Sequence, residues 1–249
     1  MIRVLELNPQ LSEAHASYGD VKLFFRWDWS GSEDAFKKAI LYNPNYPEAR
    51  RWYSHYLLIT GKQQEAHEQI DIGIELKSSS PIMYFGKAVI YLRNQEFDSA
   101  KELSKKIISV DPNYVLGLYS LALSEFGLGN ADEALKLANE GLQKFNNYPQ
   151  YMVTKMMALN ELGRLEEVKL VRDTLNKRQE TDLVPSMMLA QGEYYVGNMD
   201  GAVSYLEQAY EERNIRLFPL DPRQLFEKLN GNPRFDAIWE KVGLPELKK

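Results

Sequence analysis

Small apolar residues recur along the chain at a fixed interval of 34 residues. One series reads Ala66, Ala100, Ala134, Val168 and Ala202, and a second, seven residues further on, reads Gly73, Ile107, Gly141, Leu175 and Ala209. Small side chains at these places let paired helices approach closely, so that stacked units bury a continuous core. The pattern predicts helices that pair in regular units.

Short polar turns lie five residues before the first of these series. Gly61, Gly129, Gly163 and Gly197 share one 34-residue grid, and Gln95 occupies the place between them. Glycine takes the left-handed conformation that ends one helix and turns the chain into the next. The grid therefore predicts successive helix–turn–helix units.

A helix-end phrase confirms the period. Leu41-Tyr42-Asn43-Pro44 returns as Ile108-Ser109-Val110-Asp111-Pro112, and the two prolines are 68 residues apart, twice 34. This pattern resembles the tetratricopeptide-repeat (TPR) family, which implies an all-α, right-handed α-solenoid. We expect six units, with one extra residue in the first near 26–30. The units are 12–46, 47–80, 81–114, 115–148, 149–182 and 183–216.

The two ends differ from the repeat. Residues 1–11 look like the tail helix of an incomplete preceding repeat, which suggests a fragment or a diverged N-terminus and leaves an apolar edge for homodimerisation. Residues 217–249 predict a helical cap with short helices at about 222–229 and 233–242. The apolar residues expected to cover the last unit are Leu225, Phe226, Leu229, Phe235, Ile238, Trp239 and Val242.

Short motifs sharpen the resemblance. Trp27-Asp28-Trp29, Asn43-Pro44-Asn45-Tyr46 and the closing Asn232-Pro233-Arg234-Phe235 look like the TPR regions of bacterial multidomain signalling and transcription-regulator proteins. In those proteins the repeats follow an effector domain. The resemblance implies an interaction or sensing module, and we expect the two tryptophans to anchor the first turn between helices.

Composition narrows the chemistry. The formal net charge of −5 argues against a nucleic-acid partner. The chain has no Cys, and its three His lack the spacing of metal ligands. Neither a P-loop nor a nucleophile elbow is present. We therefore expect no enzyme, cofactor or metal.

The sequence carries no sign of a membrane or export segment. No run approaches the ~20 apolar residues of a membrane helix. The N-terminus lacks the apolar region of a signal peptide. We expect no membrane partner and a cytoplasmic location.

The resemblance also implies a concave groove lined by the first helices of the units. The candidate peptide-binding residues are Arg51, His55, Phe85, Val89, Arg93, Tyr119, Leu123, Met157, Met187, Gln191 and Tyr194. Apolar grooves of this kind mark binding sites, and methionine adapts to varied partners. At the positions of the family's carboxylate clamp stand Ser17, Val21, Arg51 and His55, which argues against a chaperone clamp.

These observations favour a protein- or peptide-binding scaffold, as the regulatory module of a bacterial signalling protein. The alternative is a small-ligand sensor that encloses a metabolite; an enzyme and an RNA-binding repeat rank lower. Three other roles for the groove residues stay open. They pack between helices, a C-terminal element fills the groove, or Arg51 and Arg93 are solvated surface arginines.

Overall fold

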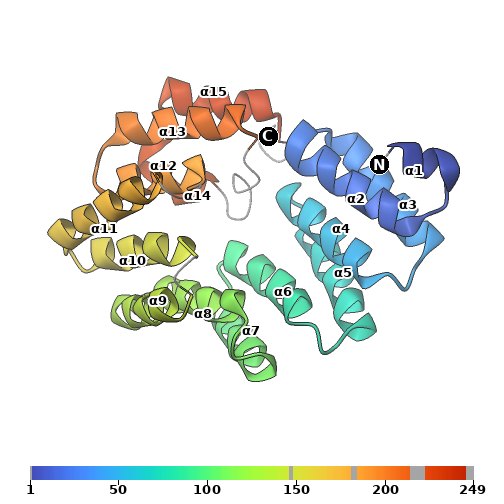
Figure 1. Cartoon of the computed structure of the whole chain (residues 1–249), viewed down its shortest axis with the longest axis horizontal. Helices are drawn as coiled ribbons and strands as arrows, with labels where there is room; N and C mark the ends of the chain where they lie inside the picture. Colours follow the sequence, from blue (N-terminus) through green and yellow to red (C-terminus); the bar gives the residue numbers. More distant parts are fainter. Residues whose placement is uncertain (1, 146–147, 181–183, 214–221, 245–249) are drawn as a thin grey trace.

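The computed structural model describes residues 2–145, 148–180, 184–213 and 222–244. Within these ranges the chain forms helices joined by short turns, without a strand (Figure 1). The helices are α1 (Ile2–Leu7), α2 (Ser12–Val21), α3 (Trp29–Tyr42), α4 (Pro47–Ile59), α5 (Gln63–Leu76), α6 (Pro81–Arg93), α7 (Phe97–Val110), α8 (Val115–Gly127), α9 (Ala131–Lys144), α10 (Gln150–Glu161), α11 (Leu165–Arg178), α12 (Ser186–Tyr195), α13 (Met199–Glu211), α14 (Pro222–Leu225) and α15 (Pro233–Val242).

Consecutive helices pair into hairpins, and the hairpins stack side by side. Helix α2 packs on α3, α4 on α5 and α6 on α7, and the pairing continues to α12 and α13. The first helices of neighbouring hairpins also touch, from α2 and α4 through to α10 and α12. The chain is thus an all-α solenoid. Figure 1 shows it bent into a ring, with α4, α6, α10 and α12 toward the centre.

Each hairpin turns at a residue with positive φ. The series is Trp27 (51°), Gly61 (80°), Gln95 (61°), Gly129 (80°), Gly163 (70°), Gly197 (82°) and Gly231 (83°). The 34-residue grid therefore extends to Trp27 and Gly231, beyond the range read from the sequence. Two non-glycine residues accept a conformation that costs about 1–2 kcal/mol each. The C-terminal segment, expected to depart from the repeat, keeps its turn register.

The extra residue of the first unit lies earlier than expected. Residues Lys22–Arg26 form a π-helical turn that continues α2. Hydrogen bonds in a π turn span five residues instead of four, so the turn accommodates an added residue without ending the helix. Trp27 follows at once in the left-handed conformation, and the next helix, α3, begins with the Asp28 carboxylate accepting from the Gly31 N–H.

The two ends of the solenoid meet. The Trp29 indole N–H donates to the Val242 carbonyl at 3.2 Å, and the ring centres of Trp27 and Tyr210 lie 5.0 Å apart. The Arg213 guanidinium stands 3.7 Å from the centre of the Trp27 ring, a favourable placement for a cation. The tryptophans expected to anchor the first turn therefore also join the first hairpin to α13 and α15.

The C-terminal cap lies on α13. Of the two helices expected there, the second is α15, whereas the first divides into α14 and a 3-10 turn at Glu227–Leu229. Residues 217–221 of this cap lie outside the described ranges. Arg234 binds α15 to α13 through Glu207 at 2.6 Å and Asp200 at 2.5 Å. Of the expected covering residues, Phe226, Leu229, Phe235, Ile238, Trp239 and Val242 are buried, and Leu225 is half-buried.

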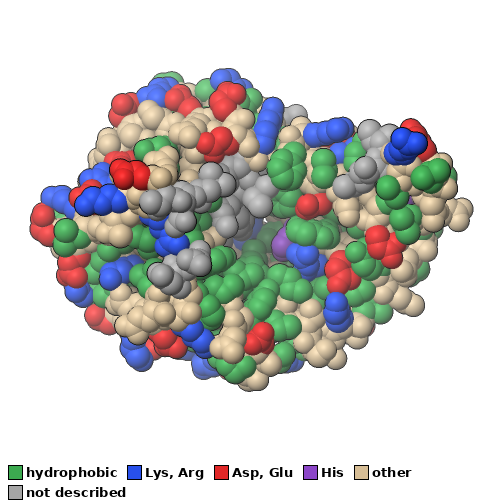
Figure 2. Space-filling view, viewed as in Figure 1, with side chains coloured by type: hydrophobic (Ala, Val, Ile, Leu, Met, Phe, Trp, Pro, Cys, Tyr) green, Lys and Arg blue, Asp and Glu red, His purple; other side chains and the backbone are tan. Residues whose placement is uncertain are grey.

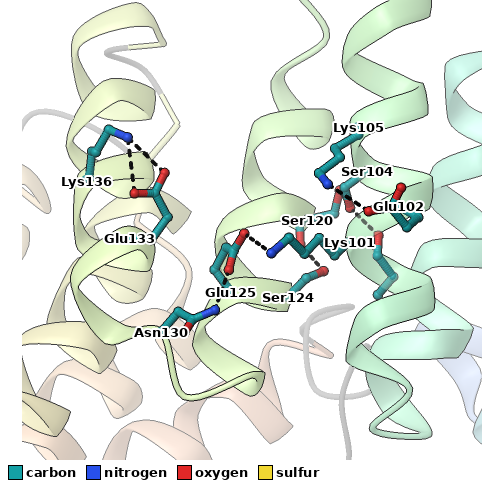
Figure 3. A network of polar contacts seen from close by, with 11 residues as sticks. Lys101, Glu102, Ser104, Lys105, Ser120, Ser124, Glu125, Asn130, Glu133 and Lys136 are labelled. Atoms are coloured by element: carbon teal, nitrogen blue, oxygen red, sulfur yellow. Dashed lines mark hydrogen bonds and ion pairs between the residues drawn. The ribbon is translucent and has the colours of Figure 1, made fainter.

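Buried carboxylates join neighbouring hairpins at two equivalent places. Glu125 on α8 forms an ion pair with Lys101 of α7 at 2.9 Å and accepts a hydrogen bond from the Asn130 side-chain amide at 2.8 Å (Figure 3). Burial raises the pKa of Glu125, but these two donors outweigh it and hold the pKa below its usual value. Two units later, the Glu193 carboxylate accepts hydrogen bonds from Arg172 and Asn198. Glu193 and Asn198 occupy the repeat positions of Glu125 and Asn130, whereas Arg172 lies three residues beyond the position of Lys101. Lys101 therefore turns toward α8.

The N-terminal edge is apolar and open. Helix α1 lies within the range 1–11 expected for a tail helix and contacts α2. Val4 is 43%, Leu7 82% and Leu41 72% exposed. Val4 and Leu7 belong to the segment 1–11 at which the sequence predicts self-association, which stays a prediction.

Candidate functional site

Two small hollows lie on the inner face of the ring, where Figure 2 shows hydrophobic side chains around a central depression. The first has a volume of about 230 Å³ and is lined by Leu92, Arg93, Gln95, Phe97, Leu123, Phe126, Gly127, Met157, Gln224 and Leu225. The second, of about 90 Å³, is lined by Phe85, Val89, Leu92, Tyr119, Leu123, Gln150, Met187, Met188, Gln191 and Leu225. Both linings are mainly apolar, as expected of a groove that takes side chains of a partner.

Leu225 of α14 lies between the hollows together with Leu92 of α6 and Leu123 of α8, because each of the three borders both. Phe226, the residue after Leu225, is fully buried against Tyr194, with ring centres 5.2 Å apart, and the Lys228 N–H donates to the Tyr194 hydroxyl at 3.3 Å. The cap therefore holds Leu225 in place. A C-terminal element enters the groove, as one alternative expected, but it leaves a hollow on each side.

The structure brings most of the predicted groove residues to these hollows. Those that border one or both are Phe85, Val89, Arg93, Tyr119, Leu123, Met157, Met187 and Gln191. Three of them also pack in the core, since Met187 is 3%, Met157 8% and Leu123 9% exposed. The groove and packing interpretations thus apply to the same residues. One edge of each side chain borders a hollow, while the rest of it packs between helices.

Three predicted residues lie elsewhere. Tyr194 packs under the cap, and Arg51 and His55 border neither hollow. Arg51 is only 9% exposed, with its guanidinium 3.9 Å from the centre of the Trp52 ring. The interpretation of Arg51 as a solvated surface residue was therefore wrong. His55 stands one turn further along α4, edge-on to the same Trp52 ring.

A family model for the tetratricopeptide repeat matches residues 85–149, which run from α6 to the segment before α10. The matched segment shares the hairpin geometry and turn register of the rest of the solenoid. The chain therefore has the fold of a tetratricopeptide-repeat solenoid, and residues 85–149 match the sequence model of that repeat. No curated protein matches the TPR chain in sequence.

Solved TPR structures share the fold over nearly all of this chain. A tetratricopeptide repeat protein from Parabacteroides merdae gives a TM-score of 0.65 at 12% identity, covering 98% of this chain and 88% of its own. PilF of Pseudomonas aeruginosa gives a TM-score of 0.58 at 13% identity, covering 94% of this chain and 98% of its own. Cut9–Hcn1, described as an APC/C hetero-tetramer, gives a TM-score of 0.65 at 13% identity, covering 96% of this chain and 44% of its own. At these identities the likeness is one of fold alone.

Sequence reasoning gave a C-terminal element in the groove as an alternative but did not identify which of its residues line the site. Gln224 and Leu225 line the first hollow, and the Gln95 amide donates to Gln224 at 3.4 Å across the ring. One signal was available, because Gly231 lies 34 residues after Gly197. Following the grid to Gly231 would have placed residues 222–229 in the position of a first helix, facing the groove.

We expect the His55 imidazole to stay neutral down to about pH 4. Burial lowers its pKa to about 3, and the positive charge of Arg51 acts in the same direction. The unfolded chain takes up this proton first, so protonation of this group opposes folding as the pH falls below about 6.5. Long-range ¹H–¹⁵N spectra across this pH range measure the ring state, and His55→Gln assigns the signal. A ring that titrates near its ordinary value contradicts the burial.

Two further findings concern the described part of the TPR chain. No group of three or more His, Asp or Glu side chains stands close enough to hold a metal ion there. Nor does any helix in those ranges combine the length and apolar character needed to cross a membrane.

Proposed function

We propose that this TPR protein is a non-catalytic scaffold that binds a peptide segment of a partner protein on the inner face of the ring. The observation that carries the proposal is the pair of apolar hollows on either side of Leu225. A peptide lying across Leu225 places one apolar side chain in each hollow. Such anchoring of a few side chains is how peptide-binding grooves obtain specificity.

The volumes favour a peptide over a metabolite. Small-molecule sites usually span about 300–1,000 Å³. The hollows here measure about 230 and 90 Å³, which suits single side chains better than a whole ligand. The similar fold in Cut9–Hcn1 belongs to a hetero-tetramer, which is consistent with use of this solenoid in assembly. A role in bacterial signalling, and self-association through the N-terminal edge, form the finer part of this proposal.

A random-peptide display library panned against the full chain tests the proposal. We expect recovered peptides to carry two apolar anchors, and Val89→Asp to weaken their binding at least about tenfold, or ~1.4 kcal/mol. Val89 is half-buried in the wall of the second hollow, where a carboxylate loses its hydration. Titration calorimetry with the recovered peptides gives the affinities.

Val110→Asp is the matched control. Val110 ends α7, is 43% exposed and borders neither hollow. We expect this variant to bind like the unmodified chain, and circular dichroism checks that both variants keep their helices. Failure to recover any peptide, or equal affinities for the two Asp variants, overturns the proposal.

A further inference from the structure

A cluster of unpartnered polar atoms lies on α2 and α4. Asp20 Oδ1, Arg51 Nε and His55 Nε2 are each buried, and none has a hydrogen-bond partner within the described ranges. Helices α2 and α4 pack against each other, and Arg51 acts electrostatically on both Asp20 and His55. Arg51 and His55 also contact the same Trp52 ring, so the three side chains share the region where α2 packs on α4.

Buried polar atoms without partners are uncommon, because each costs about 1–3 kcal/mol. Two comparable buried acids do have partners: the carboxylates of Glu125 and Glu193 each interact with one cationic side chain and one side-chain amide. Asp20 receives no such donors, and burial raises its pKa to about 6 although the Arg51 charge opposes the rise. The cluster is thus built differently from the acids that join hairpins.

The cluster lies close to the proposed peptide site. Asp20 and His55 are half-buried, so parts of their side chains reach the surface although Asp20 Oδ1 and His55 Nε2 are covered, and Arg51 is 9% exposed. A β-carbon added at Gly86 of α6 would lie 3.5 Å from Arg51 Cγ. The residue before Gly86 is Phe85, which lines the second hollow. Arg51 therefore packs on α6 one residue along the helix from a residue that lines the second hollow.

The three atoms offer complementary hydrogen-bonding groups. The Asp20 carboxylate only accepts, the Arg51 N–H only donates, and a neutral imidazole nitrogen does either, according to its tautomer. A carboxylate ligand would be attracted by Arg51 but repelled by Asp20. An ammonium ligand would be attracted by Asp20 but repelled by Arg51. A neutral carboxamide supplies an acceptor for Arg51 and a donor for Asp20 with little loss of hydration.

We propose that Asp20, Arg51 and His55 form a subsite for a primary carboxamide, the side chain of an Asn or Gln in the bound peptide. This inference rests on the proposed function, since the amide-bearing residue belongs to the same peptide. It adds a polar requirement to the two apolar anchors. The peptide then has one Asn or Gln on the side of the anchor that enters the second hollow.

Propionamide, sodium propionate and propylammonium chloride serve as probes of the full chain. We expect propionamide alone to produce a saturable shift of the His55 ring signals in ¹H–¹⁵N spectra, and Arg51→Met to abolish it. Arg50→Met is the matched control, because Arg50 on the same helix points instead to Gln69, at 2.7 Å, and to the Pro44 carbonyl. The chain has only three His, so the signals are few.

Each other outcome is decisive. No shift with any probe means that ordered water alone fills the cluster, and a response to propionate or propylammonium alone assigns a charged ligand; both overturn the inference. In the displayed peptides, replacing the Asn or Gln with Leu is expected to weaken binding about tenfold on the unmodified chain and not on Arg51→Met. Peptides with apolar anchors but no amide preference overturn the carboxamide subsite and leave the proposed function intact.

Discussion

Trp27→Ala is expected to open the ring and to lower the free energy of unfolding by about 3–5 kcal/mol, the usual cost of truncating a buried tryptophan. Trp27 is 8% exposed and packs on Tyr210 and Arg213, so its loss removes contacts between the first hairpin and α13. Urea unfolding measures the stability. Because the chain has no Cys, spin labels placed at Lys38 of α3 and Glu240 of α15 report the distance between the ends, which should broaden.

Phe25→Ala is the control for this variant. Phe25 lies two residues earlier in the π-helical turn and is 53% exposed, so its truncation should leave both measurements nearly unchanged. If Trp27→Ala unfolds like the unmodified chain and keeps a narrow distance distribution, the contacts at Trp27 do not hold the ring closed. The hydrogen bond from Trp29 to Val242 would then be the principal connection.

Gly141→Ala and Gly73→Ala should change stability in opposite directions, although the two glycines occupy the same place in the repeat. At Gly141 an added β-carbon clashes with the edge of the Tyr151 ring; this side chain is fully buried and donates its hydroxyl to the Val115 carbonyl at 2.7 Å. The ring has no free space into which to move, so we expect a loss of about 2–3 kcal/mol.

At Gly73 the added β-carbon makes only ordinary van der Waals contacts. The nearest atoms to the added carbon, on Arg50, Met83 and Pro47, lie 3.5–3.6 Å away, an ordinary van der Waals distance. Alanine favours a helix over glycine by about 1 kcal/mol, so Gly73→Ala should be neutral or stabilising. Urea unfolding of both variants gives the comparison. Equal effects in the two units would mean that the Tyr151 ring yields, contrary to its burial.

Much of the fold followed from local rules. Glycine at the turns and small residues on the paired helices are demanded by backbone conformation and by close approach, so the period alone predicted an all-α solenoid of hairpins. The pattern read from the sequence missed the two ends of the grid, Trp27 and Gly231. Trp27 adopts φ 51° because its ring is held by Tyr210 and Arg213, partners far along the chain. No local pattern announces such a contact.

The candidate site divides in the same way. The register placed Phe85, Val89 and Tyr119 on the inner face, since residues that share a repeat position share a direction. It could not show that Leu225 would separate the hollows, because that depends on where the cap folds back.

The sequence by itself therefore determined the repeat, the turns and the inward-facing positions, which depend on residues close together along the chain. Only the tertiary structure decided the closure of the ring, the division of the groove by Leu225 and the burial of Arg51 beside Asp20 and His55. Each of these depends on the summed curvature of successive hairpins. A small rotation at every unit accumulates along the solenoid and determines which distant side chains finally meet.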